Sequence, residues 1–219
     1  MEKMSCRVVS WEEVQSLAIN LARKIHRSGY RPDTLIALAR SGFVPGRILS
    51  DLLGVTDLVS LKVEHWLDTT GKHREEATIP YKIPFNIKGK RILVVDDIVD
   101  TGKSMKLSVE YLAKFQPKEL RTCVMQYITS SILKPDYYVK VVSDWTWFIY
   151  PWNFIEDIGN LTEKIMKAES RPVTLSEVKN LFKNAYGVDL DTQRLRDALA
   201  FHMIRGRFAK ANTKYYLKS

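Results

Sequence analysis

The sequence predicts an α/β protein with a parallel sheet, followed by a small C-terminal extension. Two segments support this prediction, because each has the pattern of a short apolar strand, a polar turn and an amphipathic helix. The first segment begins at Thr34 and the second at Arg91. Units of this kind in series give a parallel sheet that binds its ligands at the carboxyl ends of the strands. A chain of 219 residues has room for one such domain and a smaller appendage.

Composition and charge restrict the class of protein. The chain is 45% hydrophobic and 27% charged, as soluble globular proteins are, and it has no apolar run as long as a membrane span. The charged start of the chain is not followed by an apolar signal region, so we expect a cytoplasmic protein. Cys6 and Cys123 match no metal-site spacing and are expected as buried thiols. The net charge of +9 suits a protein that binds nucleic acid or a polyanionic small substrate. The Lys and Arg residues are spread along the chain without a dense run, which weakens the case for nucleic acid.

The other elements of the main domain follow from the same patterns. Residues 10–13 have the spacing of a capping box, and they precede an amphipathic helix that should end at Gly29. Further strands are expected at residues 57–63, 120–128 and 135–142. The connection at residues 64–86 is long and polar, which is typical of a lid or a mobile loop.

The most informative segment follows the strand that begins at Arg91. Asp96 and Asp97 are expected to end this strand, Asp100 follows, and Thr101–Ser104 opens the next helix. A helix N-terminus binds phosphate through its free N–H groups and its positive dipole end, and carboxylates accept hydrogen bonds from hydroxyls. The matching ligand therefore carries neighbouring hydroxyls and a phosphate, as a ribose 5-phosphate does.

The segment also resembles two other kinds of site, a P-loop and a solvated helix cap. Residues 102–104 read like the end of a nucleotide-binding P-loop, but that motif needs a glycine where Asp97 stands, and a carboxylate would repel the phosphate. The segment is also compatible with a solvated loop that caps the helix through Asp100 or Thr101.

Residues 94–104, Val-Val-Asp-Asp-Ile-Val-Asp-Thr-Gly-Lys-Ser, resemble the phosphoribosyl-pyrophosphate motif of the type I phosphoribosyltransferases, in particular the archaeal purine enzymes. The resemblance implies that Asp96 and Asp97 hold the ribose hydroxyls, that Asp100 lies beside the base, and that Thr101–Ser104 wraps the 5-phosphate. It also implies Mg²⁺ as cofactor, with Asp96 and Asp97 as metal ligands, and it implies phosphoribosyl pyrophosphate and a purine base as substrates.

The turn Arg40-Ser41-Gly42 resembles the pyrophosphate loop of the same family, although by itself it also reads as a plain strand–helix connection. Ser41 stands where the purine enzymes often carry a glycine. Asp100 and Arg40 are the catalytic residues that the resemblance implies. The residues assigned to phosphoribosyl pyrophosphate are Asp96, Asp97, Thr101, Gly102, Lys103, Ser104, Arg40, Ser41, Gly42 and Lys62. The loop at 64–86 corresponds to the lid that closes over the transition state in this family.

Residues 144–153 form an aromatic cluster that reads either as core or as a ligand site. In the 6-oxopurine branch of the family, a similar segment forms a hood over the base. The resemblance implies that Trp147 stacks on the base and that Phe148 contacts it through its backbone. The residues assigned to the base are Trp147, Phe148, Asn153 and Ile128.

Two departures from the 6-oxopurine enzymes lead us to expect adenine as the preferred base. Residues 126–131 lack the lysine that donates to the exocyclic oxygen, and no lysine follows until Lys134. Asn153 stands where those enzymes carry an acid. A site built around a hydrogen bond rejects ligands that cannot make it. The alternatives are a 6-oxopurine enzyme for hypoxanthine, guanine or xanthine, and a transcription regulator that senses a purine or phosphoribosyl pyrophosphate.

The C-terminal residues read as a separate unit. We expect a phosphoribosyltransferase domain with its hood at residues 1–165 and a basic extension at 171–219. Within the extension, Thr174 begins a second capping box, two amphipathic helices follow, and residues 208–217 suggest a hairpin. This order is winged-helix-like. We favour a role in packing or dimer formation over DNA binding, and we expect a homodimer or higher oligomer with no membrane association.

Overall fold

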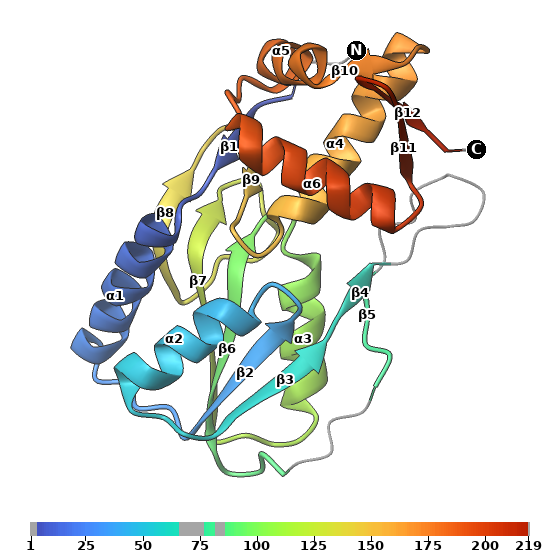
Figure 1. Cartoon of the computed structure of the whole chain (residues 1–219). Helices are drawn as coiled ribbons and strands as arrows, with labels where there is room; N and C mark the ends of the chain where they lie inside the picture. Colours follow the sequence, from blue (N-terminus) through green and yellow to red (C-terminus); the bar gives the residue numbers. More distant parts are fainter. Residues whose placement is uncertain (1–3, 66–76, 82–85, 219) are drawn as a thin grey trace. The chain divides into compact units, whose positions relative to one another are not determined.

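The computed structural model describes residues 4–65, 77–81 and 86–218 (Figure 1). The chain divides into two compact units, one formed by residues 11–144 and the other by residues 1–10 together with 145–219. Among the described residues, no helix is long and apolar enough to cross a membrane.

A five-stranded parallel sheet forms the centre of the unit 11–144. Its order is β3-β2-β6-β7-β8, and each neighbouring pair runs parallel. The strands are β2 (Thr34–Ala39), β3 (Leu58–Lys62), β6 (Arg91–Val99), β7 (Glu119–Ile128) and β8 (Tyr137–Val142). The α/β class and the parallel sheet expected from the sequence are confirmed.

Three helices cover this sheet: α1 (Trp11–Arg27), α2 (Phe43–Leu53) and α3 (Lys103–Ala113). The apolar side chains of the strands alternate between the two faces, as strand geometry requires. Ile36 and Val94 point to the face that also holds Met105 and Leu112 of α3. On the other face, Gly46 of α2 packs against the strand β2. The sheet is therefore buried on both sides.

The connection expected as a lid is described only in part. It contains a two-stranded antiparallel pair, β4 (Glu64–His65) with β5 (Ala77–Thr78). Most of the expected lid, residues 66–76 and 82–85, lies outside the described residues.

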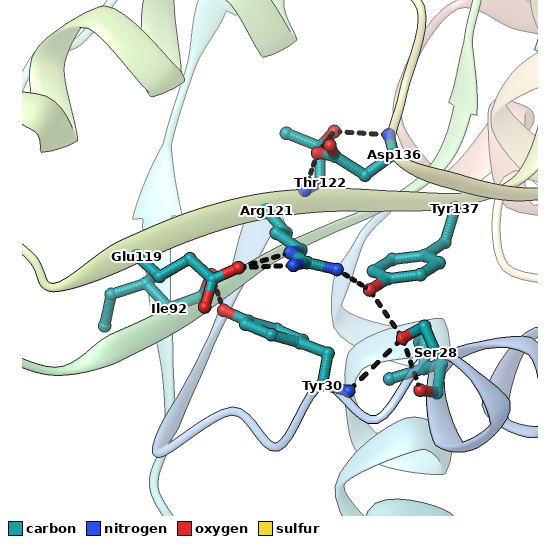
Figure 2. A network of polar contacts seen from close by, with 9 residues as sticks. Ser28, Tyr30, Ile92, Glu119, Arg121, Thr122, Asp136 and Tyr137 are labelled. Carbon is teal, nitrogen blue, oxygen red and sulfur yellow. Dashed lines mark hydrogen bonds and ion pairs between the residues drawn. The ribbon is translucent and has the colours of Figure 1, made fainter.

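A polar network fixes the amino-terminal ends of β7 and β8 to the end of α1 (Figure 2). The Arg121 guanidinium pairs with Glu119, donates to the Tyr137 hydroxyl, and lies 4.6 Å from the centroid of the Tyr30 ring. The Ser28 hydroxyl donates to the carbonyl of Ile25, so the Tyr137 hydroxyl must donate to Ser28 Oγ at 2.8 Å. This chain of donors holds the edge of the sheet opposite to the predicted ligand edge.

The other unit joins the start of the chain to its end. The strand β1 (Cys6–Val8) pairs in parallel with β9 (Trp147–Ile149). The helix α4 (Phe154–Glu169) follows, and the sequence patterns discussed above had not indicated it. Its apolar residues, Ile158, Leu161 and Ile165, follow the helical spacing that would have predicted it.

The last part of this unit has the order strand, helix, helix, hairpin. The elements are β10 (Val173–Thr174), α5 (Leu175–Tyr186), α6 (Thr192–Ile204), β11 (Phe208–Ala211) and β12 (Lys214–Leu217). The strands form an antiparallel sheet of order β10-β12-β11. The capping box at Thr174 and the hairpin are confirmed. With α4 in front, this arrangement is a winged helix, in which α5 and α6 form the helix-turn-helix.

One hydrophobic core joins α4 to the winged helix. Phe154 and Ile158 of α4 belong to the same buried cluster as Phe182 of α5 and Leu195 of α6. The compact units therefore divide the chain at residues 10 and 144, whereas the sequence placed a boundary between 165 and 171. Whether residues 1–165 form a functional domain stays a prediction.

Candidate functional site

The two predicted phosphate turns follow neighbouring strands at the carboxyl edge of the parallel sheet. Strands β2 and β6 are neighbours, and Ala37 is in register with Val95. The Gly42 backbone packs so closely between them that a Cβ there would lie 2.6 Å from both the Leu38 and Val95 carbonyl oxygens. The turn after β2 therefore contacts β6 at the residue immediately before Asp96. Only glycine fits this approach.

The turn at residues 40–42 opens the helix α2. The Gly42 N–H donates to the Leu38 carbonyl at 2.8 Å, and the Phe43 N–H donates to the Arg40 carbonyl at 3.2 Å. The peptide bond between Ala39 and Arg40 is cis. Arg40 is exposed and Ser41 is half-buried, and the first turn of α2 contains no acid. A helix end without a neighbouring negative charge favours an anion.

The paired carboxylates belong to β6 itself, because this strand continues to Val99 rather than ending at Asp96 as the sequence suggested. The reason is that β6 continues to pair with β7, where Ile98 is in register with Gln126. Asp96 accepts from the Asp97 N–H at 2.9 Å, and Asp97 accepts from the Ile98 N–H at 2.8 Å. Each acid bends its side chain onto the following residue, and Asp97 is almost fully buried.

Burial raises the pKa of Asp96 well above its ordinary range, and the neighbouring Asp97 carboxylate adds to the rise. The hydrogen bond from the Asp97 N–H opposes it. Two crowded carboxylates of this kind are stabilised in their charged form by a cation or by hydroxyl donors. The pair therefore suits a ligand that brings either one.

The turn after β6 leads into α3 through Gly102, which has a positive φ of 82°. A Cβ at Gly102 would lie 2.3 Å from Ser131 Oγ and 2.9 Å from the Leu133 nitrogen. The Ile132 N–H donates to the Thr101 carbonyl at 3.0 Å. The connection between β7 and β8 thus supports this turn from behind. No sequence pattern had indicated a role for residues 131–133.

The first turn of α3 contains no acid, and it begins at Lys103. The Lys103 N–H is 3.4 Å from Thr101 Oγ1, and Ser104 is half-buried in the same turn. Residues 101–104 therefore present backbone N–H groups and hydroxyls in the way that phosphate sites do. Asp100, also half-buried, lies between this turn and the strand end.

Two further predicted residues lie on the same sheet. Lys62, at the end of β3, is in register with Ala39 and thus beside the turn at 40–42. Its ammonium pairs with Glu64, which raises its pKa, and it lies 5.5 Å from the centroid of the Tyr81 ring. Ile128 ends β7, and its side chain is buried.

The predicted base-binding aromatic residues lie in the other unit. Trp147 is 39% exposed, so its ring is not part of a core, and Phe148 is half-buried. Asn153 is the N-cap residue of α4 without a side-chain capping bond. The core interpretation of this cluster holds for Tyr150, which is buried and stacked on Trp152 with 4.7 Å between ring centroids. The Trp147 ring lies 6.3 Å from the Trp145 ring between centroids, tilted by 53°, and part of it is exposed to a ligand.

The described residues contain no group of three or more His, Cys, Asp or Glu side chains that would enclose a metal ion. Asp96 and Asp97 are two adjacent oxygen donors. Mg²⁺ typically binds through one or two carboxylates together with water and substrate phosphates. The pair fits a magnesium ion that arrives with a phosphorylated substrate, and it does not fit a closed protein cage.

Comparisons with known proteins show similarity to the phosphoribosyltransferases, in agreement with the two phosphate turns predicted at this edge of the sheet. The model of the phosphoribosyl transferase domain family matches residues 10–154. The xanthine-guanine phosphoribosyltransferase of Idiomarina loihiensis is 30% identical over 146 residues, which are 66% of this chain and 85% of that protein. The hypoxanthine-guanine phosphoribosyltransferase of Aquifex aeolicus is 30% identical over 118 residues, 52% of this chain and 65% of that protein.

A solved structure shows the same similarity. The purine phosphoribosyltransferase from Pyrococcus horikoshii Ot3 is 31% identical, with a TM-score of 0.60. The match covers 68% of this chain and 94% of that chain.

Proposed function

We propose that this chain, which belongs to the phosphoribosyl transferase domain family and is a phosphoribosyltransferase, transfers ribose 5-phosphate from phosphoribosyl pyrophosphate to a 6-oxopurine base in purine salvage. The products are the purine nucleotide and pyrophosphate. The observation that carries the proposal is the close approach of Gly42 to the Val95 carbonyl, which brings the turn at residues 40–42 beside the strand that carries Asp96 and Asp97.

The choice of a 6-oxopurine replaces the adenine preference expected from the sequence. Relatives at 30% identity are named for xanthine, guanine and hypoxanthine, and these names favour the alternative over adenine. The Lys134 ammonium lies 5.8 Å from the centroid of the Tyr138 ring, near the amino-terminal end of β8, so it does not replace the missing strand lysine. The other departure has a physical answer. Asn153 carries a carbonyl oxygen, which accepts from a 2-amino group as an acid does.

The proposed roles follow from the charges that the reaction creates. Departure of pyrophosphate breaks the bond between the ribose ring carbon and oxygen, and positive charge develops on that carbon. Arg40 and the N–H groups of residues 40–42 would neutralise the leaving pyrophosphate, and Thr101–Ser104 would hold the 5-phosphate. Asp96 and Asp97 would accept from the ribose hydroxyls. A base nitrogen held in line then forms the new bond, and Asp100 takes up its proton.

Mg²⁺, when bound, would supply charge neutralisation at the phosphate oxygens. Asp96 and Asp97 are the residues proposed to hold it or its water shell. The raised pKa of Asp96 would fall as the cation arrives, because an opposite charge favours the ionised carboxylate.

Steady-state kinetics with hypoxanthine, guanine, xanthine and adenine tests the proposal. Pyrophosphate release is followed in the presence of phosphoribosyl pyrophosphate and Mg²⁺. We expect at least one 6-oxopurine to have a higher kcat/KM than adenine. A higher kcat/KM for adenine than for all three others would contradict the base assignment. Absence of pyrophosphate release with every base would contradict purine transfer itself.

A further inference from the structure

The C-terminal winged helix carries a concentrated positive charge that purine transfer does not use. Residues 171–219 contain ten Lys and Arg against four Asp and Glu, an excess of six out of the net +9 of the whole chain. Residues 198–219 contain five of these cations and no acid. The match to the phosphoribosyl transferase domain ends at residue 154, before residues 171–219 begin.

The acids near the winged helix neutralise only some of its cations. Arg171 pairs with Glu169 and Glu177, Lys179 and Lys183 pair with Asp189, and Arg207 pairs with Glu163. Six other cations in the described part of this segment form no ion pair, and all six are exposed. They are Arg194, Arg196, Arg205, Lys210, Lys214 and Lys218. All of them belong to α6, to the turn after it, or to the β11–β12 hairpin and the residue that follows.

The backbone presents these cations on one helix and one hairpin. Leu195, Leu199 and His202 of α6 point into the core, so the helical repeat leaves Gln193 and Arg196 on the exposed side. Arg196 donates to Gln193 Oε1 at 3.3 Å, and Gln193 Nε2 donates to Asp197 Oδ1 at 2.8 Å, so this side of the helix also carries one exposed acid. Thirteen residues give α6 a length of about 20 Å, enough to lie in a DNA major groove.

The hairpin supplies the second part of the surface. Its two strands are joined by the two-residue turn 212–213, where Asn212 adopts a φ of 52°. Asparagine tolerates this conformation in tight hairpin turns. Lys210 and Lys214 lie within two residues of the turn, one on each strand, and they point to opposite faces of the hairpin because Lys210 pairs with Tyr215 and Lys214 with Ala211. The Lys210 ammonium lies 5.3 Å from the centroid of the Tyr215 ring. Two exposed cations at a hairpin tip, next to a helix-turn-helix, are placed as phosphate contacts beside a groove-bound helix.

We propose that α6 and the β11–β12 hairpin form a binding surface for duplex DNA. In this surface Gln193 and Arg196 face the base edges of the major groove, and Lys210 and Lys214 contact backbone phosphates. Arg205 lies between the two groups and adds a further phosphate contact.

The charge distribution favours DNA over a second copy of the chain. Phe201 and Ile204 of α6 are 50% and 81% exposed, and apolar side chains of this kind also occur at subunit interfaces. A two-fold interface would, however, place this cationic surface against itself, and like charges at close range repel. Against DNA, the same apolar side chains can contact thymine methyl groups and sugars.

Fluorescence anisotropy with the full-length protein tests the proposal. The probe is a fluorescein-labelled random-sequence duplex of about 30 bp, titrated at salt concentrations from about 50 to 200 mM. We expect binding that weakens steeply with salt. The double variant Lys210→Gln/Lys214→Gln should bind roughly tenfold or more weakly, with the slope of log K against log[salt] reduced by about 2.

A matched control is Lys88→Gln/Lys114→Gln, which removes the same charge from two exposed lysines in the unit 11–144. Its affinity and salt slope should equal those of the unchanged protein, and both double variants should keep their transferase activity. Equal weakening in the two double variants would overturn the proposal, because it would reveal an effect of net charge alone.

Three further outcomes would also overturn it. One is the absence of duplex binding at the lowest salt concentration. Another is tighter binding of a single strand or of duplex RNA of the same length. The third is self-association in sedimentation velocity that Phe201→Ala/Ile204→Ala abolishes in a protein that binds no duplex, since this would assign the surface to a second copy.

Discussion

His202 of α6 fills the space beside Gly159 of α4. A Cβ added at residue 159 would lie 1.9 Å from Nε2 of His202 and 2.2 Å from its Cε1. The imidazole is fully buried, and its Nε2 lies 2.7 Å from the Ile155 carbonyl oxygen. Glycine at 159 therefore permits the close approach of these two helices.

Gly159→Ala should destabilise the unit that contains α4. Alanine would improve intrinsic helix propensity by about 1 kcal/mol, but its Cβ would displace a buried, hydrogen-bonded ring. Overpacking of this kind costs about 1–3 kcal/mol, so we expect a net loss in the free energy of unfolding. Urea titration followed by circular dichroism measures it.

The double variant Gly159→Ala/His202→Ala is the control, since it removes the ring that the new Cβ would meet. Its loss should be smaller than the sum of the losses in the two single variants. Additive losses would show that the contact between residues 159 and 202 does not account for the cost.

The partners of His202 hold it in its neutral form. A carbonyl only accepts, so Nε2 donates to Ile155, and a guanidinium only donates, so Nδ1 accepts from Arg207 at 3.3 Å. Burial lowers the pKa of His202 below its ordinary value of 6.5, and the charges of Arg207 and Arg205 lower it further. The Ile155 carbonyl and the Glu156 carboxylate oppose this shift.

A lowered pKa makes the stability of this unit depend on pH. Below about pH 6.5 the unfolded chain binds a proton at His202 that the folded chain does not. The free energy of unfolding should therefore fall as pH decreases through this range and level off below the folded-state pKa. His202→Gln keeps an amide donor and a carbonyl acceptor but does not titrate. It should lose this part of the pH dependence, and an unchanged profile in the variant would refute the assignment.

Local patterns predicted the elements whose burial and capping are encoded within a few residues. The strands at Thr34 and Arg91, the capping box at Thr174 and the hairpin near residue 212 are all found. The paired acids are also found next to the glycine turns.

The features that the sequence did not predict depend on contacts between residues far apart in the chain. The pairing of β1 with β9 joins residues about 140 positions apart, and no local pattern encodes it. Asp96 stays in β6 because β7 pairs with it, which the sequence of β6 alone does not reveal. The support of Gly102 by Ser131 likewise depends on the neighbouring strand. The names of the relatives favour a 6-oxopurine over adenine, so the two local departures at residues 126–131 and at Asn153 did not predict the base that the comparisons favour.

Gly102→Ala should weaken the binding of phosphoribosyl pyrophosphate. Alanine at this position would have to adopt the positive φ of Gly102, which is unfavourable for a residue with a Cβ. Its Cβ would also lie 2.3 Å from Ser131 Oγ and 2.9 Å from the Leu133 backbone nitrogen. The phosphate turn would have to shift, and misplaced N–H donors bind phosphate less well. Isothermal titration with phosphoribosyl pyrophosphate and Mg²⁺ measures the loss.

Gly89→Ala is the matched control for the backbone strain. Gly89 has a φ of 71°, and its added Cβ would meet nothing within 4 Å. It should cost about 1 kcal/mol of stability, as strain at a positive φ does, and leave affinity unchanged. Equal affinities for Gly102→Ala and Gly89→Ala would exclude the proposed role of the turn.

Tyr137→Phe should destabilise the parallel-sheet unit without changing its active-site edge. The hydroxyl accepts from Arg121 and donates to Ser28, and the ring is buried (Figure 2). Its removal leaves both partners short of a hydrogen bond, which costs about 1–3 kcal/mol. Urea titration provides the measurement. Tyr81→Phe, at a side chain that is 66% exposed, should be neutral, and an equally neutral Tyr137→Phe would show that water replaces the network.

Asp100→Asn should separate binding from proton transfer. Asp100 lies between the end of β6 and the phosphate turn, and asparagine keeps its shape but cannot take up a proton. If Asp100 accepts the proton of the base, kcat should fall by roughly 10²–10⁴-fold while the affinity for phosphoribosyl pyrophosphate stays the same. Asp51→Asn removes the same charge from an exposed position on α2 and should leave kcat unchanged. A near-normal kcat in Asp100→Asn would limit this residue to positioning the turn, and a parallel loss of affinity would assign it to the ribose site instead.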